Sequence, residues 1–219
     1  FCNTTADNNT ALGYNSLLAN TTGSQNTALG SISLCAGTTG DFNTAVGEKS
    51  MIGVVTGDSN AAFGQGSLRC NTSGCFNTAL GAAALSANTT ASDNTAVGKN
   101  ALTANTTGSS NTSVGTDSSK TMTTGVNNTA LGYAALCTLT TGDENVAVGK
   151  SALKNSTTSD SNTAVGNGAL AANTTGAKNT AVGHSALTTN TTGVNNTGIG
   201  QDSLTVATTG NNNAAVGTC

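Results

Sequence analysis

Apolar residues recur singly along this chain at a fixed interval of 17 residues, with polar residues filling the spaces between them. Counting each copy from an asparagine as repeat position 1, position 4 is apolar in every copy, and position 8 is alanine or serine. Position 9 is leucine except at Met51 and Ser119, and position 5 is glycine from Gly13 through to Gly217. The consensus, without insertion or deletion, is N-T-A-[VL]-G-x-x-[AS]-L-x-x-N-T-T-G-x-x.

This pattern excludes a helix and favours short strands. Seventeen residues is not a whole number of 3.6-residue turns, so an apolar stripe would drift around a helix. Positions 1–4, as in residues 94–97, are rich in threonine and valine and predict a short strand. Glycine at position 5 suits a corner, positions 8 and 9 are expected to begin a second strand, and N-T-T-G is a turn. Each repeat then forms one coil, and successive coils pair in parallel at about 4.7–4.9 Å.

The sequence therefore predicts an all-β fold, a parallel β-solenoid or β-roll, with residues 1–219 as a single array of about 13 coils. Alternation along the strand places the alanine of position 3 on the opposite face from positions 2 and 4. Our interpretation puts the alanine inside the coil and turns the position-4 side chain towards partner chains. The reverse assignment remains open.

The asparagine of position 1 is invariant. Identical residues one coil apart lie directly above each other, so their amides can form a hydrogen-bonded ladder, and we expect a structural role rather than a ligand site. The residues concerned are Asn9, Asn26, Asn43, Asn60, Asn77, Asn94, Asn111, Asn128, Asn145, Asn162, Asn179, Asn196 and Asn213.

The segments Asn-Thr-Ala-Val-Gly at 94–98 and Asn-Thr-Ala-Leu-Gly at 26–30 resemble the head repeats of YadA-like trimeric autotransporter adhesins. The longer phrase N-T-A-V-G-x-x-A-L-x-x-N-T-T-G is also similar to repeats in phage and large-virus tail fibres. The resemblance covers essentially the whole chain, although the repeat is longer than the usual adhesin head unit. It implies a left-handed β-roll that assembles as a homotrimer.

Charge and composition exclude several classes of partner. The net charge is -3 and only 8% of residues are charged, all at positions 6, 7, 10, 16 or 17, so we expect solvated corners there. There is no basic stripe for a nucleic acid and no apolar run near the roughly 20 residues of a membrane-spanning helix. Because the chain begins at Phe1 without an initiator methionine, it is interpreted as an excerpt of a longer protein.

The cysteines offer little chemistry. They occupy variable positions without a C-x-x-C motif, and His184 is the single histidine, so neither a metal nor another cofactor is expected. Disulfides, within or between chains, and free thiols are the two open alternatives. The best intrachain candidates are Cys70 and Cys75, five residues apart; the others are Cys2, Cys35, Cys137 and Cys219.

No catalytic constellation is present in the sequence, and we do not expect an enzyme. His184 lies at a charged, solvated position without a fixed Ser or Cys partner. The aspartates lack the G-G-x-G-x-D spacing of calcium-binding β-rolls.

Asparagines at position 12 create N-x-S/T sequons, which raises glycosylation as a hypothesis. We favour the alternative that N-T-T-G is turn chemistry. The candidate acceptors are Asn20, Asn71, Asn88, Asn105, Asn173 and Asn190.

These observations predict a structural or adhesive fibre shaft, at the cell surface or outside the cell, that presents a side or tip to a host receptor or glycan. The expected partner is a homo-oligomer, with a trimer favoured over a filament. The alternatives are a virion or phage tail-fibre shaft on the virion surface and a self-assembling open filament. An ice-binding β-solenoid is a minor alternative, because the threonines do not form the T-x-T pattern of such faces.

Overall fold

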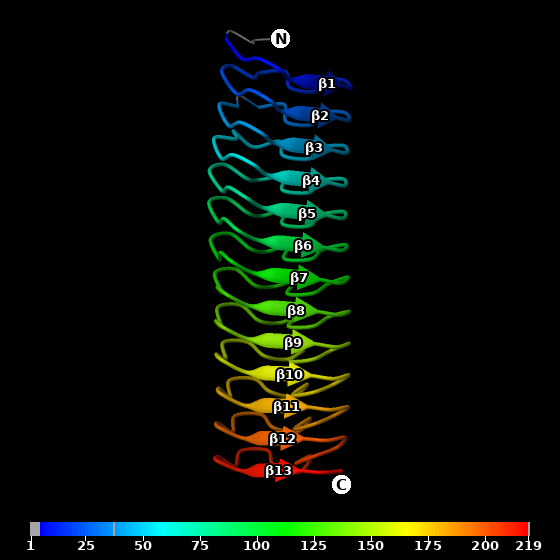
Figure 1. Cartoon of the computed structure of the whole chain (residues 1–219), viewed down its shortest axis with the longest axis vertical. Helices are drawn as coiled ribbons and strands as arrows, with labels where there is room; N and C mark the ends of the chain where they lie inside the picture. The colour runs from blue at the N-terminus through cyan, green and yellow to red at the C-terminus, as the bar shows by residue number, and fades with distance from the viewer. Residues whose placement is uncertain (1–4, 37, 219) are drawn as a thin grey trace. The chain divides into compact units, whose positions relative to one another are not determined.

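The structure is a computed structural model that describes residues 5–36 and 38–218, and in these the chain forms parallel strands, one to each repeat (Figure 1). The chain divides into two compact units, residues 1–110 and 111–219. Strands of the first unit are β1 (Thr10–Leu12), β2 (Thr27–Leu29), β3 (Thr44–Val46), β4 (Ala61–Phe63), β5 (Thr78–Leu80) and β6 (Thr95–Val97). Strands of the second are β7 (Thr112–Val114), β8 (Thr129–Leu131), β9 (Val146–Val148), β10 (Thr163–Val165), β11 (Thr180–Val182), β12 (Thr197–Ile199) and β13 (Ala214–Val216).

Within each unit, consecutive strands pair in parallel and in strict register. Thr27 lies beside Thr44 and Ala28 beside Ala45 in the first unit, and Ala164 beside Ala181 in the second. Each coil is therefore one repeat long, and equivalent residues stack on one another. The prediction of an all-β, parallel β-solenoid is confirmed.

The prediction of a second strand at positions 8 and 9 is wrong. Residues at positions 7 and 9 have positive φ, as at Asn15 (53°) and Leu17 (49°), which an extended strand does not allow. Between them, the N–H of Ser16 donates to the carbonyl of Gly13 at 3.3 Å and closes a turn. Neighbouring coils are still joined there, because the N–H of Leu17 donates to the carbonyl of Ser33 at 3.1 Å.

The core is a thin column of small and medium side chains. The alanines of position 3, such as Ala28 and Ala45, are fully buried, together with the position-9 leucines, such as Leu34 and Leu68. The inward assignment of position 3 is thus confirmed over its reverse, and the position-4 side chains face outward. Whether partner chains cover them stays a prediction.

Gly166 shows two reasons why position 5 must be glycine. Its φ of +138° is a conformation that residues with a Cβ rarely adopt, and an added Cβ would overlap the carbonyl oxygen of Gly183 in the next coil. The close approach of successive coils therefore depends on this glycine.

Candidate functional site

The position-1 asparagines bind both their own coil and the neighbouring one. The Oδ1 atom of Asn26 accepts the backbone N–H of Asn43 at 2.8 Å, in the next coil. The Nδ2 group of Asn26 donates to the carbonyl of Gly40 at 2.8 Å, which closes its own coil. In the second unit, Asn145 accepts from the N–H of Asn162 at 3.0 Å in the same way.

Their side chains also contact one another directly. Nδ2 of Asn60 donates to Oδ1 of Asn43 at 3.0 Å, and Nδ2 of Asn179 donates to Oδ1 of Asn162 at 3.1 Å. Eleven of the thirteen are buried; Asn9 and Asn213, in the first and last coils, are partly exposed. Buried amides whose donors and acceptors are used inside the coil hold the fold and leave no group for a ligand.

A second column of asparagines, at position 12, points into the coil as well. Nδ2 of Asn88 donates to the carbonyl of Ala91 at 3.0 Å and to Oδ1 of Asn71 at 2.9 Å in the preceding coil. Asn105 repeats both contacts, to Gly108 and to Asn88. Sequence reasoning recognised the turn but missed this ladder between coils.

Burial of the candidate glycosylation sites supports the alternative that N-T-T-G is turn chemistry. Asn20, Asn71, Asn88, Asn105, Asn173 and Asn190 are all at most 2% exposed. The Nδ2 atom that would carry a glycan donates hydrogen bonds in the interior, where a sugar cannot fit. The sequence held a signal for this, since Met122 and Leu139 occupy position 12 in other copies and are also fully buried.

The position-12 ladder is interrupted after Asn20 and after Asn105, where the next repeat lacks an asparagine. Among the described residues, the Oδ1 atoms of Asn20 and Asn105 are buried without a hydrogen-bond partner, as is the hydroxyl of Ser203. The repeats that follow those two asparagines carry Gly37 and Met122 at position 12. The Oδ1 atoms are thus left without an amide donor from that position, at a cost of about 1–3 kcal/mol for each unsatisfied group.

Cys70 and Cys75, the candidates for an intrachain disulfide, are free thiols, which is the other of the two alternatives left open by the sequence. The Sγ of Cys75 instead accepts the N–H of Asp58 at 3.3 Å. Cys35 and Cys137 are free as well, and burial raises the pKa of both thiols, which lowers their nucleophilicity. Cys2 and Cys219 lie outside the described residues.

His184 lies on the surface. Its side chain is 59% exposed, and Nδ1 is 4.0 Å from Oδ1 of Asp202, an ion pair only when the imidazole is protonated. Over residues 5–36 and 38–218, no three His, Cys, Asp or Glu side chains gather in a way that could hold a metal ion. In the same part of the chain, no helix is long and apolar enough to cross a membrane.

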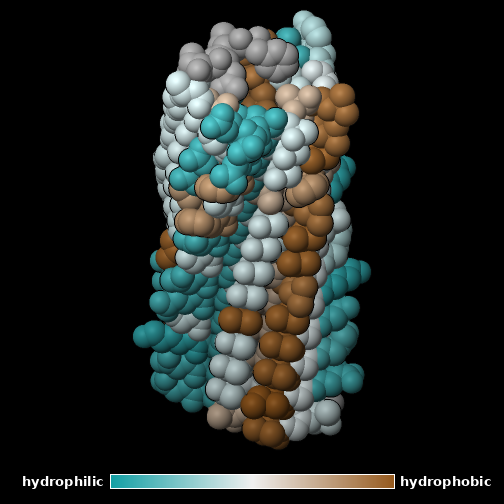
Figure 2. Space-filling model, turned by 45° about the horizontal axis from the view of Figure 1, so that its top comes forward, coloured by the Kyte–Doolittle hydropathy of each residue, from teal (hydrophilic) through white to brown (hydrophobic). Residues whose placement is uncertain are grey.

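An apolar column is the main feature of the outer sheet face in each unit. Its members include Leu12 (67% exposed), Leu80 (48%) and Leu131 (47%). Figure 2 shows hydrophobic residues gathered in one column beside a weakly polar one. We define the apolar column as Leu12, Leu29, Val46, Phe63, Leu80 and Val97 in the first unit, and Val114, Leu131, Val148, Val165, Val182, Ile199 and Val216 in the second.

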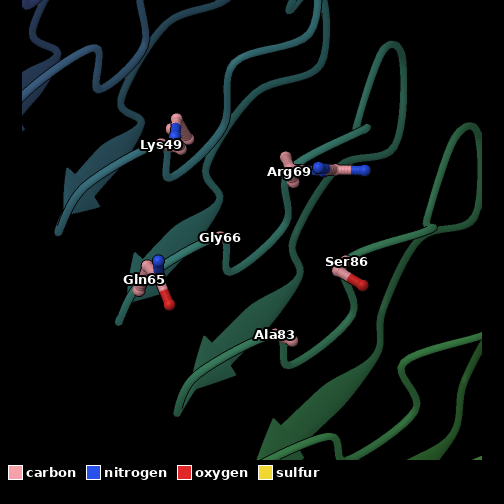
Figure 3. A pocket seen from close by; sticks show the side chains of 6 residues that line it. All are labelled: Lys49, Gln65, Gly66, Arg69, Ala83 and Ser86. Atoms are coloured by element: carbon pink, nitrogen blue, oxygen red, sulfur yellow. The ribbon is translucent and has the colours of Figure 1, made fainter.

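A hollow of about 380 Å³ opens on another side of the first unit. Figure 3 shows Gly66 and Ala83 between Gln65 on one side and Arg69 and Ser86 on the other. Lys49 completes the lining, and its Nζ lies 3.0 Å from Oε1 of Glu48.

Comparisons of this chain with protein-family models, with curated proteins and with solved structures found no match.

Proposed function

We propose that this chain is the shaft of a fibre outside the cell or on a virion, in which copies associate side by side through the apolar column. The observation that supports it most directly is the outward placement of position 4 in coil after coil, where these apolar side chains are exposed or half-buried. An apolar surface of this regularity is unusual on a monomer and is typical of an interaction site.

The chemistry of the outer sheet face supports a second copy of the chain as the partner. Positions 2 to 4 carry no charged residue in any repeat, so two such faces can meet without burying a charge. A copy also has the same spacing between coils, so each apolar side chain meets an equivalent one. Closed cyclic symmetry is the common outcome of such self-association, and we favour a homotrimer.

The test is the oligomeric state of the purified chain, measured by sedimentation velocity together with electron microscopy. The expected result is a discrete trimeric particle. The variant carrying Val148→Thr, Val165→Thr and Val182→Thr should dissociate, because it exchanges methyl groups for hydroxyls at the contact while keeping β-branched side chains on the strands.

The matched control is the variant carrying Thr175→Val and Thr192→Val, exposed residues of the N-T-T-G turn rather than of the outer sheet face, which should leave the trimer intact. A chain that stays monomeric at concentrations of about 100 µM, well above typical assembly constants, would contradict the proposal.

Two further candidates differ in what they bind. An open filament would appear in the same micrographs as particles of unlimited length. An ice-binding face is supported by the column of outward threonines at position 2 beside the apolar column, as at Thr163 and Thr180. The absence of thermal hysteresis and ice shaping in the purified protein would rule it out.

A further inference from the structure

The hollow beside Arg69 exists because two consecutive repeats carry very small residues at position 7. Lys49 and Asn100 occupy this position in the flanking repeats, and Gly66 and Ala83 occupy it between them. The surface therefore has a depression two coils long, lined by residues at positions 6, 7 and 10 of the repeat.

The hollow is positively charged on a chain whose net charge is negative. The lining holds two cations, Lys49 and Arg69, and no anion; Lys49 is paired with Glu48 outside the lining, so Arg69 supplies the unpaired positive charge. Arg69 is exposed, and within the described residues its guanidinium has no ion-pair partner. A guanidinium presents a planar fork of donors that matches a carboxylate.

The uncharged lining supplies neutral hydrogen-bonding groups. Gln65 is exposed and offers both an amide donor and a carbonyl acceptor. The hydroxyl of Ser86 donates to the carbonyl of Thr103 at 3.3 Å and lies 3.0 Å from the Thr103 hydroxyl, which leaves it one lone pair to accept a further hydrogen bond. A volume of about 380 Å³ is at the lower end of the range for small-ligand sites.

We propose that this hollow binds a sugar that carries a single carboxylate. The carboxylate pairs with Arg69, with Lys49 elsewhere in the lining, and the sugar hydroxyls bind Gln65 and Ser86. A monoanion matches the single unpaired charge of the site better than a phosphate, which carries about -1.5 to -2 at neutral pH. A role of this site in attachment along a fibre rests on the proposed function. The binding of a sugar acid by the chain is independent of that proposal.

The experiment is titration of the purified chain with glucuronic acid and with N-acetylneuraminic acid, followed by calorimetry or ligand-observed NMR. Glucose serves as the neutral probe and inorganic phosphate as the general anion. We expect saturable binding of the sugar acids with a dissociation constant on the order of 1 mM, and much weaker binding of glucose and phosphate.

Three variants locate the site. Arg69→Gln removes the guanidinium, and Gly66→Asn fills the hollow; both should weaken binding at least about tenfold. Gly66→Asn should fold, since φ at Gly66 is +63°, asparagine tolerates this conformation, and an added Cβ meets nothing within 4 Å. Lys154→Gln, which removes a charge from the same repeat position as Arg69 but in the second unit, should leave affinity unchanged.

The results separate this inference from the fibre proposal. Equal binding by all three variants, or no saturable binding by the native chain, would overturn the site. Phosphate binding as tight as the sugar acids would overturn its preference for a sugar carboxylate. If the chain stays monomeric in sedimentation but binds sugar acids, the binding site is supported and only the fibre proposal is contradicted.

Discussion

At the scale of the residue, this fold depends on glycines and asparagines that other residue types could not replace. The glycine of position 5 admits the next coil, and the two asparagine columns supply donors and acceptors that the thin core cannot obtain from water. Polar groups are tolerated inside because nearly all of them are paired, and each lost partner leaves a buried group unsatisfied.

Gly166→Ala should be strongly destabilising, by about 3 kcal/mol, because it combines positive φ with a clash against the Gly183 carbonyl. The control lies two residues on. Gly168→Ala should change stability by less than about 1 kcal/mol, since its Cβ would lie 3.7 Å from the Ser185 hydroxyl and alanine already occupies this position at Ala83. Urea unfolding monitored by circular dichroism measures both, and equal losses would refute the close-approach explanation.

Asn145→Asp should make stability depend on pH. The Nδ2 group of Asn145 donates to Oδ1 of Asn128 at 3.1 Å and to the carbonyl of Ser159 at 2.8 Å, so a carboxylate there would face acceptors in a buried site. Its pKa in the folded chain should rise above the usual value of about 3.9. The folded state then holds the proton more tightly than the unfolded state, and stability falls as pH rises from about 4 through the raised pKa.

We expect a loss of about 3 kcal/mol or more at pH 7 and a smaller loss at pH 3, where the protonated carboxyl donates one bond. The control Asn167→Asp changes an exposed side chain at position 6 and should show little pH dependence. Thermal unfolding between pH 3 and 8 provides the measurement; identical profiles for the two variants would contradict the buried ladder.

At the scale of the element, the coil is the unit that the sequence specifies. Within a coil, a smaller interior side chain at one position is compensated by a larger one at another. Ser119 replaces the leucine of position 9 and Met122 replaces the asparagine of position 12 in the same coil, and both side chains are buried. Exchanges that conserve total volume are those that packed interiors tolerate best. Each coil then contacts mainly the coils before and after it, as in other repeat proteins.

Deleting one whole coil should therefore be tolerated. Removal of residues 162–178 joins Ser161 to Asn179, which restores position 17 followed by position 1. The shortened chain should fold with the same circular dichroism per residue and a melting temperature lower by about 5 °C or less. Removal of only residues 171–178 leaves a partial coil and should unfold the second unit to a much greater extent; similar stability of the two deletions would argue against the coil as the unit.

At the scale of the whole molecule, each unit has an interior closed by hydrogen bonds and an outer sheet face that is apolar and uncharged. The interior is closed by its own hydrogen bonds, whereas water contacts the exposed side chains of the apolar column in the isolated chain. Charged residues occupy other positions of the repeat, away from that face.

If copies associate through the apolar column, the melting temperature should rise with protein concentration, because unfolding then includes dissociation. It should change little between 50 mM and 1 M NaCl, since no charge lies on that face, and it should rise in sodium sulfate. Scanning calorimetry at protein concentrations from about 5 to 500 µM tests this. A melting temperature independent of concentration would contradict lateral association.

The sequence by itself determined the fold class, the length of the coil and the identity of the residues that stack, because a strict 17-residue period assigns each residue a fixed environment. It did not determine that each coil holds only one strand. Leu17 and its equivalents have positive φ, and leucine is not a residue type that indicates such a conformation. It also did not resolve which face of the strand is inward, because alternation is symmetric. Only the tertiary structure decided that, by burying Ala28 and by turning the position-12 asparagines into the core, where their amides meet across coils.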